Sequence, residues 1–338
     1  MPLSQKETFK LLGISKFHEA GFNGSRVKIM NDEKILKEYR GVDEERWGKI
    51  IAPKGYQKNS SKWHGSACQN ILLDVCPDAT YISFPFSGAF SNNLYKCEAA
   101  EYIKENGVHL FTSSQLSGTI NGGKEKALQD CIDSGCTFFC AAGNNSDEGV
   151  FGESKSDKYL AIGFVDKNLK YIGTSSIGKE LDYVTIPECY GNWTSYAAPL
   201  FCGMCGLVQD FFLCKTGRAL KRNELIEFIN DNLIDVEKEG FDVKTGHGLF
   251  VLPDPININI SKYVPEYGGG SEYTGFPEVV EAELTIDSNI IKIRGVEHEF
   301  DVVPFIKDGR TYVPVRFLEL LGYGVEWVES ERRVILRK

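Results

Sequence analysis

A run of small and apolar residues from Ala197 to Leu207 limits the possible folds of this chain more than any other stretch. No face of a helix built from these residues is polar, so we predict a helix that is buried on nearly every side. Such a helix needs a large core around it. A chain of 338 residues can supply that core, because it has room for one large domain and one small one.

Ser195 stands just before this run. A hydroxyl at the beginning of a buried helix lies close to the positive end of the helix dipole. That position suits a nucleophile whose reaction generates an oxyanion. It is equally the ordinary position of a serine that caps a helix, so the residue alone leaves both interpretations open.

Composition restricts the classes of function. Apolar residues make up 42% of the chain and charged residues 25%, as is usual for a soluble globular protein. The net charge of −9 argues against nucleic acid as the main partner, because phosphate binding needs a basic face. The N-terminal residues contain no apolar signal core, and we see no apolar run that approaches the length of a membrane span. We therefore expect no membrane partner and a cytoplasmic or particle-associated location.

The ten cysteines lie mostly inside apolar runs, whereas a disulfide framework is typical of short, loop-rich secreted chains. Cys202 and Cys205 form a CxxC pair, but no second pair stands at metal-binding spacing. We interpret both as small core residues in a reducing compartment. The sequence predicts no metal site and no cofactor.

Predicted strands and helices alternate through most of the chain. The strands are expected over 80–84, 108–112, 137–142, 160–165 and 181–184, and helices over 7–20, 92–106, 123–134 and 222–233. Strands separated by helices of this length form βαβ units, so we predict an α/β fold with a parallel sheet.

Polar residues stand at the ends of several of these elements. Residues 31–33, Asn-Asp-Glu, close a strand, Asn144 follows a later strand, and His64 begins a largely apolar helix. Ligands and catalytic groups collect at the carboxyl ends of strands in an open parallel sheet. Together with Ser195 these residues supply the hydroxyl, imidazole, acid and amide donor that acyl transfer needs.

Four segments of the sequence resemble the subtilisin-like serine peptidases, in the same order along the chain. They are His64–Ser66 with Pro77–Ala79, Ala141–Asn144, Gly178–Asp182, and Thr194–Pro199 with Gly203. These match the HGT…PDA, AAGN, G-x-E-L-D and TSxAxP…G segments of that family. The resemblance extends over roughly residues 15 to 255.

The resemblance implies a three-layer domain around a parallel sheet and a protein or peptide substrate. It makes Ser195 the nucleophile, His64 the general base and Asn144 the donor to the oxyanion. By analogy with the family, residues 112–115 line the substrate.

The segment that should supply the acid is degraded. Matching Asp32 and the three residues after it to the family's Asp-Ser-Gly-Ile makes Asp32 the acid, and this is our first choice. Alternation through Val27 and Ile29 favours Asn31 or Glu33 instead, since residues two apart in a strand share a face. With Asn31 in that position the chain would be a crippled or inactive peptidase.

Two other departures concern the surroundings of the site. Trp193 stands where the family has a glycine before its Thr-Ser, which we expect to alter the entrance to the nucleophile. The short stretch between His64 and Pro77 lacks the loop that calcium-dependent subtilisins insert there, so we expect no calcium at that place.

The C-terminal part has a different character. Residues 253–277 are rich in proline and glycine, as connectors are. We place a peptidase-like domain at 1–258, a linker at 259–278 and a small α+β domain at 279–338. Residues 308–317 of the small domain resemble the stalk domain of bacterial surface proteins that is labelled copper amine oxidase N-terminal-like.

In the small domain we predict strands over 283–293 and 297–303 and a helix over 315–321. It contains only one histidine, His298, and no cysteine cluster, so the resemblance does not imply copper. A spacer, or a contact to a protein assembly partner, is the expected role.

Two functions are compatible with these patterns. The first is a serine endopeptidase that works through an acyl-enzyme and is attenuated by its degraded acid segment. The second is a pseudopeptidase that serves as a structural or binding component of a larger assembly, such as a phage or surface particle. The choice between them depends on which of residues 31–33 faces His64.

Overall fold

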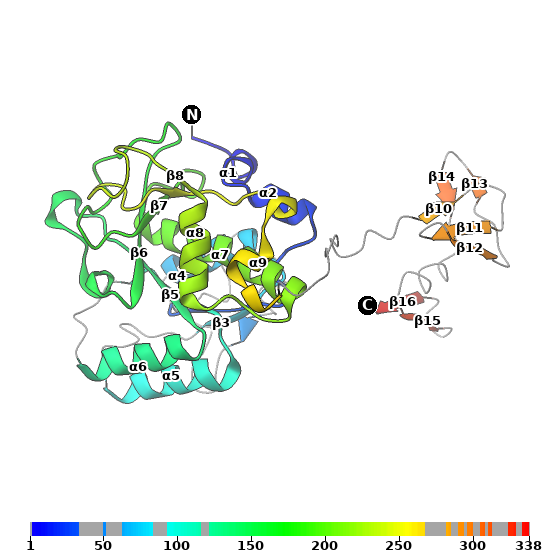
Figure 1. Cartoon of the computed structure of the whole chain (residues 1–338), viewed down its shortest axis with the longest axis horizontal. Coiled ribbons are helices and arrows are strands. Elements are labelled where there is room, and N and C mark those ends of the chain that lie inside the picture. Colours follow the sequence, from blue (N-terminus) through cyan, green and yellow to red (C-terminus); the bar gives the residue numbers. More distant parts are fainter. Residues whose placement is uncertain are drawn as a thin grey trace. The chain divides into compact units, whose positions relative to one another are not determined.

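The structure of the chain is a computed structural model (Figure 1). It describes residues 2–33, 50–51, 63–83, 93–115, 122–267, 282–284, 290–293, 296–299, 305–307, 310–312, 324–328 and 333–337. The chain divides into two compact units, Met1–Glu272 and Tyr273–Lys338. All four residues that the sequence singles out for catalysis lie in the first unit.

A sheet forms the centre of the first unit. Its nine described strands stand in the order β2-β3-β1-β4-β5-β6-β7-β9-β8, and all neighbours run parallel except β8 and β9. The strands are β1 (Lys28–Asn31), β2 (Ile50–Ile51), β3 (Thr80–Ser83), β4 (Leu110–Ser113), β5 (Thr137–Ala141), β6 (Tyr159–Phe164), β7 (Tyr183–Thr185), β8 (Leu233–Ile234) and β9 (Leu249–Phe250). The predicted α/β class with a parallel sheet is confirmed.

Helices cover both faces of this sheet, which gives three layers (Figure 1). The helices of the first unit are α1 (Gln5–Leu11), α2 (Ile14–Glu19), α4 (Trp63–Val75), α5 (Asn93–Asn106), α6 (Gly122–Asp133), α7 (Thr194–Thr216), α8 (Arg222–Asp231) and α9 (Ile260–Tyr263), with short 3₁₀ turns η1 (Ser146–Glu148), η2 (Gly152–Lys155), η3 (Pro255–Asn257) and η4 (Pro265–Tyr267). Ile29 of β1 joins the core that contains α4 and α7, whereas Met30 joins the core of α5 and α6. Neighbouring residues of a strand thus point to opposite layers.

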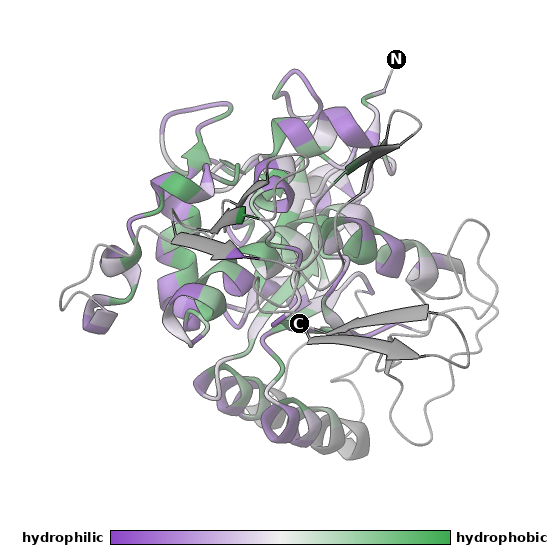
Figure 2. Cartoon of the chain, turned by 90° about the vertical axis from the view of Figure 1, so that its right-hand side faces the viewer, coloured by the Kyte–Doolittle hydropathy of each residue, from purple (hydrophilic) through white to green (hydrophobic). Residues whose placement is uncertain are grey.

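The apolar run of the sequence forms the central helix α7, and its residues from Ala197 to Val208 are all buried. Hydrophobic residues gather around it in the middle of the first unit (Figure 2). Among the described residues, α7 alone is long and apolar enough to cross a membrane, with a mean hydropathy of 1.5 over 18 residues. This corrects our expectation that no run approaches that length. However, 89% of this stretch is buried inside the protein, as in the core helix of a folded domain.

Close packing of α7 against α4 explains two glycines in the run. A Cβ atom on Gly203 would lie 2.9 Å from Val75 Cβ, and one on Gly206 would lie 2.9 Å from Cys76 Sγ. Neither position has room for a side chain. The backbone of α7 at these two glycines therefore packs directly against side chains at the end of α4 and just after it.

One predicted helix, over 7–20, is two helices in the structure. The chain breaks between α1 and α2 at Gly13, which has a φ of 77°. A Cβ atom there would lie 2.1 Å from the carbonyl oxygen of Leu252, so only glycine fits this close approach. Apolar periodicity continues through the break, which is why the sequence pattern did not reveal it.

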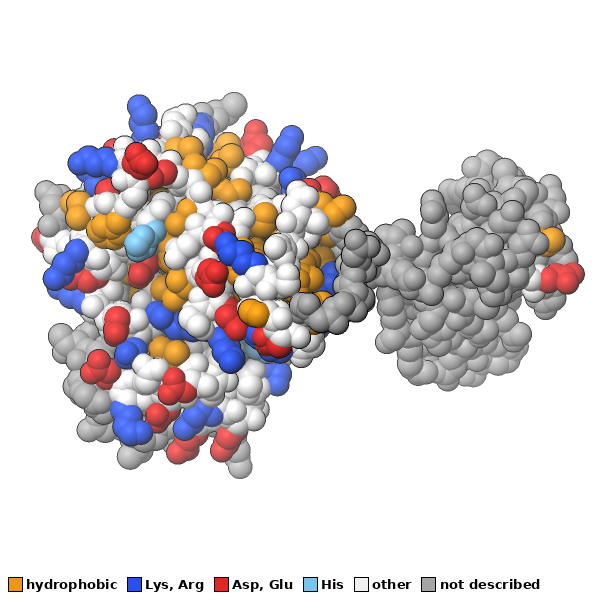
Figure 3. All heavy atoms as spheres, in the orientation of Figure 1, with side chains coloured by type: hydrophobic (Ala, Val, Ile, Leu, Met, Phe, Trp, Pro, Cys, Tyr) orange, Lys and Arg blue, Asp and Glu red, His pale blue; other side chains and the backbone are white. Residues whose placement is uncertain are grey.

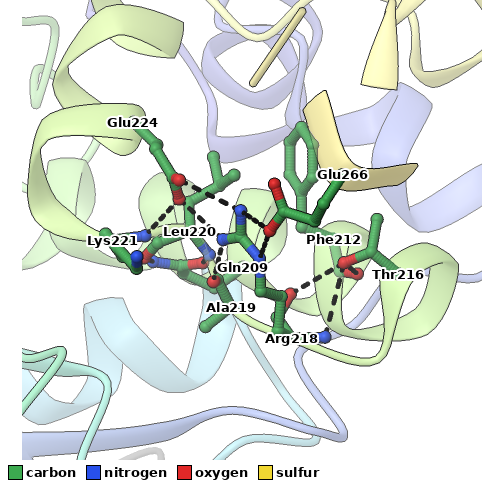
Figure 4. A network of polar contacts seen from close by, with 9 residues as sticks. All are labelled: Gln209, Phe212, Thr216, Arg218, Ala219, Leu220, Lys221, Glu224 and Glu266. Carbon is green, nitrogen blue, oxygen red and sulfur yellow. Dashed lines mark hydrogen bonds and ion pairs between the residues drawn. The ribbon is translucent and has the colours of Figure 1, made fainter. Parts of the chain in front are cut away.

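The first unit extends further along the chain than the predicted boundary at residue 258. The side chain of Gln209 in α7 donates to the carbonyl of Leu220 and accepts from its N–H, at 2.9 and 2.7 Å (Figure 4). Arg218 in the same loop pairs with Glu224 of α8 and with Glu266 of η4.

Residues 259–267, which we predicted to begin the linker, are therefore folded onto this unit. Tyr263 of α9 is buried, and its hydroxyl donates to Asp231 of α8 at 2.6 Å. The observed division of the chain falls after Glu272.

The second unit contains antiparallel strands. β10 (Ala282–Leu284), β11 (Ile290–Ile293) and β12 (Val296–Glu299) form one sheet. β13 (Phe305–Lys307) pairs with β14 (Arg310–Tyr312), and β15 (Gly324–Val328) pairs with β16 (Arg333–Arg337), in two sheets of two strands each. The strand predicted over 283–293 is two strands, and the helix predicted over 315–321 lies outside the described residues.

Basic and acidic side chains are interspersed on the face of the first unit shown in Figure 3. On that face the described residues form no extended patch of one sign.

Candidate active site

The imidazole of His64 contacts the carboxylate of Glu33. His64 Nδ1 lies 2.7 Å from Glu33 Oε2. Glu33 follows the end of β1 and its side chain is fully buried, whereas His64, in the first turn of α4, keeps 32% of its side-chain surface exposed. Gln115, after β4, donates from Nε2 to the same carboxylate oxygen at 3.3 Å. A buried acid thus holds an imidazole that remains partly exposed.

Asp32, our first choice for the acid, does not make this contact. Residues 31 and 33 share the face that looks toward α4, where Asn31 Nδ2 donates to Gln69 Oε1 at 3.4 Å. Strand alternation had favoured Asn31 or Glu33 over Asp32, and of these two Glu33 contacts His64. Burial, and then the charge of Glu33, raises the pKa of Asp32 well above its ordinary value. A carboxyl in these surroundings favours its neutral form. Because Glu33 makes the contact with His64, it replaces Asp32 as the candidate acid.

Ser195 is the second residue of α7 and not its cap. The N-cap residue is Trp193, which has extended backbone and makes no side-chain capping bond. Trp193 is 53% exposed. The interpretation of Ser195 as an N-cap is therefore wrong, and its hydroxyl is available for another role in the first turn of a buried helix.

The carbonyl oxygen of Ser195 has two unusual donors. In an α-helix it would accept from the N–H four residues later, but that residue is Pro199, which has no N–H. Instead Ser114 Oγ donates to it at 2.8 Å and Cys68 Sγ at 3.2 Å. The backbone of Ser195 is thereby bound to the segment that follows β4 and to α4.

Asn144 follows β5 and points toward the beginning of α7. Its Oδ1 accepts from the N–H and the hydroxyl of Thr194, at 3.0 and 3.1 Å. Two donors on the oxygen fix the orientation of the amide, so its Nδ2 group is turned to the other side as a donor. The Thr194 hydroxyl also accepts from the N–H of Gly143 at 3.2 Å, which joins the two segments.

A cavity of about 210 Å³ lies beside Ser195. It is lined by Ser114, Ala141, Gly143, Asn144, Asn145, Phe151, Thr194 and Ser195. Of the segment 112–115, which we expected to line the substrate, Ser114 reaches this cavity. The nucleophile candidate and the amide donor candidate therefore share one concave surface.

His64 approaches the same helix start from the other side. Its ring stacks on that of Tyr196, the residue after Ser195, with 6.4 Å between the centroids. Within the described residues, the hydrogen bonds of Ser195 are made by its backbone, and none joins its Oγ to His64. Catalytic hydrogen bonds are often long without substrate and shorten when it binds. The structure thus brings Glu33, His64, Ser195 and Asn144 to one end of the sheet.

Sequence reasoning missed Cys68. Its thiol is buried next to Ser195, and burial raises the pKa of that thiol well above its ordinary value. The spacing of Cys68 from His64 could have indicated its place in the site, because residues four apart on a helix lie on the same face.

The first unit has the fold of subtilisin-like proteases, and comparisons with known proteins agree with this. Subtilisin DY from Bacillus licheniformis is 23% identical over 225 residues, which are 59% of this chain and 82% of that protein.

Two solved structures match with low identity. A lanthipeptide protease has a TM-score of 0.61 at 14% identity, covering 72% of this chain and 92% of that one. The prenylagaramide maturation protease PagA has a TM-score of 0.57 at 17% identity, covering 74% and 98%.

The second unit resembles a different family. Residues 277–336 match the family described as copper amine oxidase N-terminal domain. The resemblance expected from the sequence is confirmed for both parts of the chain.

Proposed function

We propose that the first unit is a serine endopeptidase that cleaves peptide bonds through an acyl-enzyme on Ser195. The observation that carries the proposal is the 2.7 Å contact between His64 Nδ1 and the buried Glu33 carboxylate. The carboxylate keeps a proton on Nδ1, which makes Nε2 the basic nitrogen. A base oriented in this way beside a serine is the arrangement that nucleophilic acyl transfer requires.

The proposed reaction assigns a step to each of these residues. Nε2 of His64 takes the proton of the Ser195 hydroxyl while Oγ attacks the scissile carbonyl carbon. Nδ2 of Asn144 and the positive end of α7 stabilise the negative charge on the carbonyl oxygen. His64 then gives its proton to the leaving amine, and water releases the acyl group by the same route in reverse.

Glu33 stabilises the imidazolium that forms in each of these steps. Its burial strengthens this interaction, because charges interact more strongly away from water. Gln115 supports the carboxylate through the 3.3 Å hydrogen bond to the oxygen that faces His64.

We propose a peptide or an extended segment of a protein as the substrate. The cavity beside Ser195 takes one side chain of such a chain, and the two solved relatives are by name a lanthipeptide protease and a maturation protease. A precursor peptide is therefore a suitable first test substrate. For the second unit we propose a role as a spacer or as the contact to an assembly partner.

Labelling with a fluorophosphonate probe tests the proposed function. We expect the wild-type chain to be labelled at Ser195 and a Ser195→Ala variant to show background only. The matched control is Ser134→Ala, which removes a serine hydroxyl at the end of α6. If the wild type and Ser195→Ala label equally, the chain is a pseudopeptidase and the proposal is lost.

A further inference from the structure

Three donors of different chemistry meet beside the Ser195 carbonyl. One ligand atom each of Glu33, His64 and Cys68 lies within 4.8 Å of the others. His64 and Cys68 come from successive turns of α4, and Glu33 comes from the end of β1. The i and i+4 spacing places the imidazole and the thiol on one face of the helix, opposite the carboxylate.

This donor set selects the kind of cation. A carboxylate oxygen, an imidazole nitrogen and a thiolate sulfur are the three ligand types that Zn²⁺ takes, usually in a tetrahedron. Calcium and magnesium prefer oxygen ligands alone, so they suit the site poorly. Three protein ligands leave the fourth position of the tetrahedron for water.

A second observation points to a missing ligand. Glu33 is only 1% exposed, and its buried Oε1 has no hydrogen-bond partner among the described residues. Leaving a buried charged oxygen without a partner costs free energy. A cation bound between the carboxylate and the thiol would supply that partner.

We propose that Glu33, His64 and Cys68 bind Zn²⁺ and that this binding switches the peptidase off. The thiol gives its proton to the solvent when sulfur coordinates the metal, and its hydrogen bond to the Ser195 carbonyl is lost. Coordination occupies Nδ1 of His64, the nitrogen that faces Glu33, and the proton of the neutral ring moves through the solvent to Nε2. Both nitrogens are needed for the proposed catalysis, Nδ1 for the contact with Glu33 and Nε2 for the serine proton. The loss of activity rests on the proposed function, whereas the binding itself does not.

Cobalt titration of the full chain tests the binding directly. A thiolate bound to Co²⁺ gives a charge-transfer band in the near ultraviolet, and we expect this band to saturate at one equivalent and to disappear when Zn²⁺ is added. Cys68→Ser should lose the band. Cys189→Ser, which removes a half-buried thiol elsewhere, should keep it. A wild type without the band, or a band that persists in Cys68→Ser, would overturn the site.

Probe labelling in the presence of Zn²⁺ tests the consequence. We expect Zn²⁺ to suppress labelling of the wild type and of Cys189→Ser, and a chelator to restore it. With each variant normalised to its own metal-free rate, Cys68→Ser should need at least about tenfold more Zn²⁺. Equal sensitivity of Cys68→Ser and the wild type would overturn the switch.

The two readouts separate the two proposals. If the metal-free chain is not labelled at all, the peptidase proposal fails, but the cobalt band still decides the site. A thermal unfolding curve of metal-free Cys68→Ser shows whether that variant is folded. Glu33→Gln provides a second variant, which should weaken cobalt binding while retaining the thiol.

Discussion

The two sides of the candidate site are held in place by different means. On the side of Ser195, backbone constraints dominate, since Pro199 removes a helical N–H and Gly203 allows α4 to come close. On the side of His64, the position depends on side chains that touch, such as Glu33 at 2.7 Å. Backbone constraints restrict residue types strongly and leave a clear sequence motif. A side-chain contact can be made from more than one position, so its motif is weaker.

The largest expected effect concerns the side of His64, where the position of the imidazole depends on a side-chain contact. Glu33→Gln should lower kcat by about 10³- to 10⁴-fold, because the amide no longer stabilises the imidazolium. Asp32→Asn changes the neighbouring acid by the same chemistry and should leave kcat within about threefold, since Asp32 does not contact His64. Peptide hydrolysis by the two variants gives the comparison. A large loss in Asp32→Asn with none in Glu33→Gln would reverse the assignment.

The stability of the first unit should also depend on the partly buried carboxyl of Asp182, which accepts from the N–H of Ala161 at 2.7 Å. Burial raises its pKa from 3.8 to about 6. Between these values the unfolded chain has lost this proton while the folded chain keeps it, so the free energy of unfolding falls as the pH rises from about 4 to 6.

Asp182→Asn should remove this dependence, which amounts to about 2–3 kcal/mol. Urea unfolding of the variant and the wild type at pH 4 and pH 7 measures it. Parallel pH profiles for the two proteins would contradict the raised pKa.

The backbone half of the comparison is tested by Gly203→Ala. A methyl group 2.9 Å from Val75 Cβ should force α4 and α7 apart and lower the free energy of unfolding by about 1–3 kcal/mol. Gly173→Ala is the matched control, because nothing lies within 4 Å of a Cβ there. Chemical denaturation of both variants decides the matter. An unchanged Gly203→Ala protein would show that the backbone of α7 does not pack closely against Val75.

The smallest expected effect concerns the donors to the Ser195 carbonyl. Ser114→Ala removes one of the two donors to the Ser195 carbonyl and should cost about 1 kcal/mol, or roughly a fivefold loss in kcat with little change in KM. Ser134→Ala, which removes a serine that donates to a backbone carbonyl in α6, should have no effect on kcat. Equal kinetics of Ser114→Ala and the wild type would mean that Cys68 alone holds the carbonyl.

Much of this fold could be predicted from the sequence. The alternation of strands and helices predicted the parallel sheet, and the apolar run predicted the buried helix α7. The approximate position of Asn144 and Ser195 at one end of the sheet followed from the order of elements. These features are local or periodic, so single segments reveal them.

Other features depend on contacts between distant segments. The close approach of Leu252 requires a glycine at the break, Gly13. Residues 259–267 are held on the first unit by contacts with Asp231 and Arg218. Glu33 lies beyond the last residue of β1, where strand alternation had left Asn31 and Glu33 equal. Only the position of His64 on α4 separates them.

A proton NMR spectrum tests the contact between Glu33 and His64 most directly. An imidazole N–H that donates to a buried carboxylate gives a resonance far downfield. We predict this resonance in the wild type and in Asp32→Asn, and its absence from His64→Ala and Glu33→Gln. A resonance that survives in Glu33→Gln but disappears in Asp32→Asn would contradict the account.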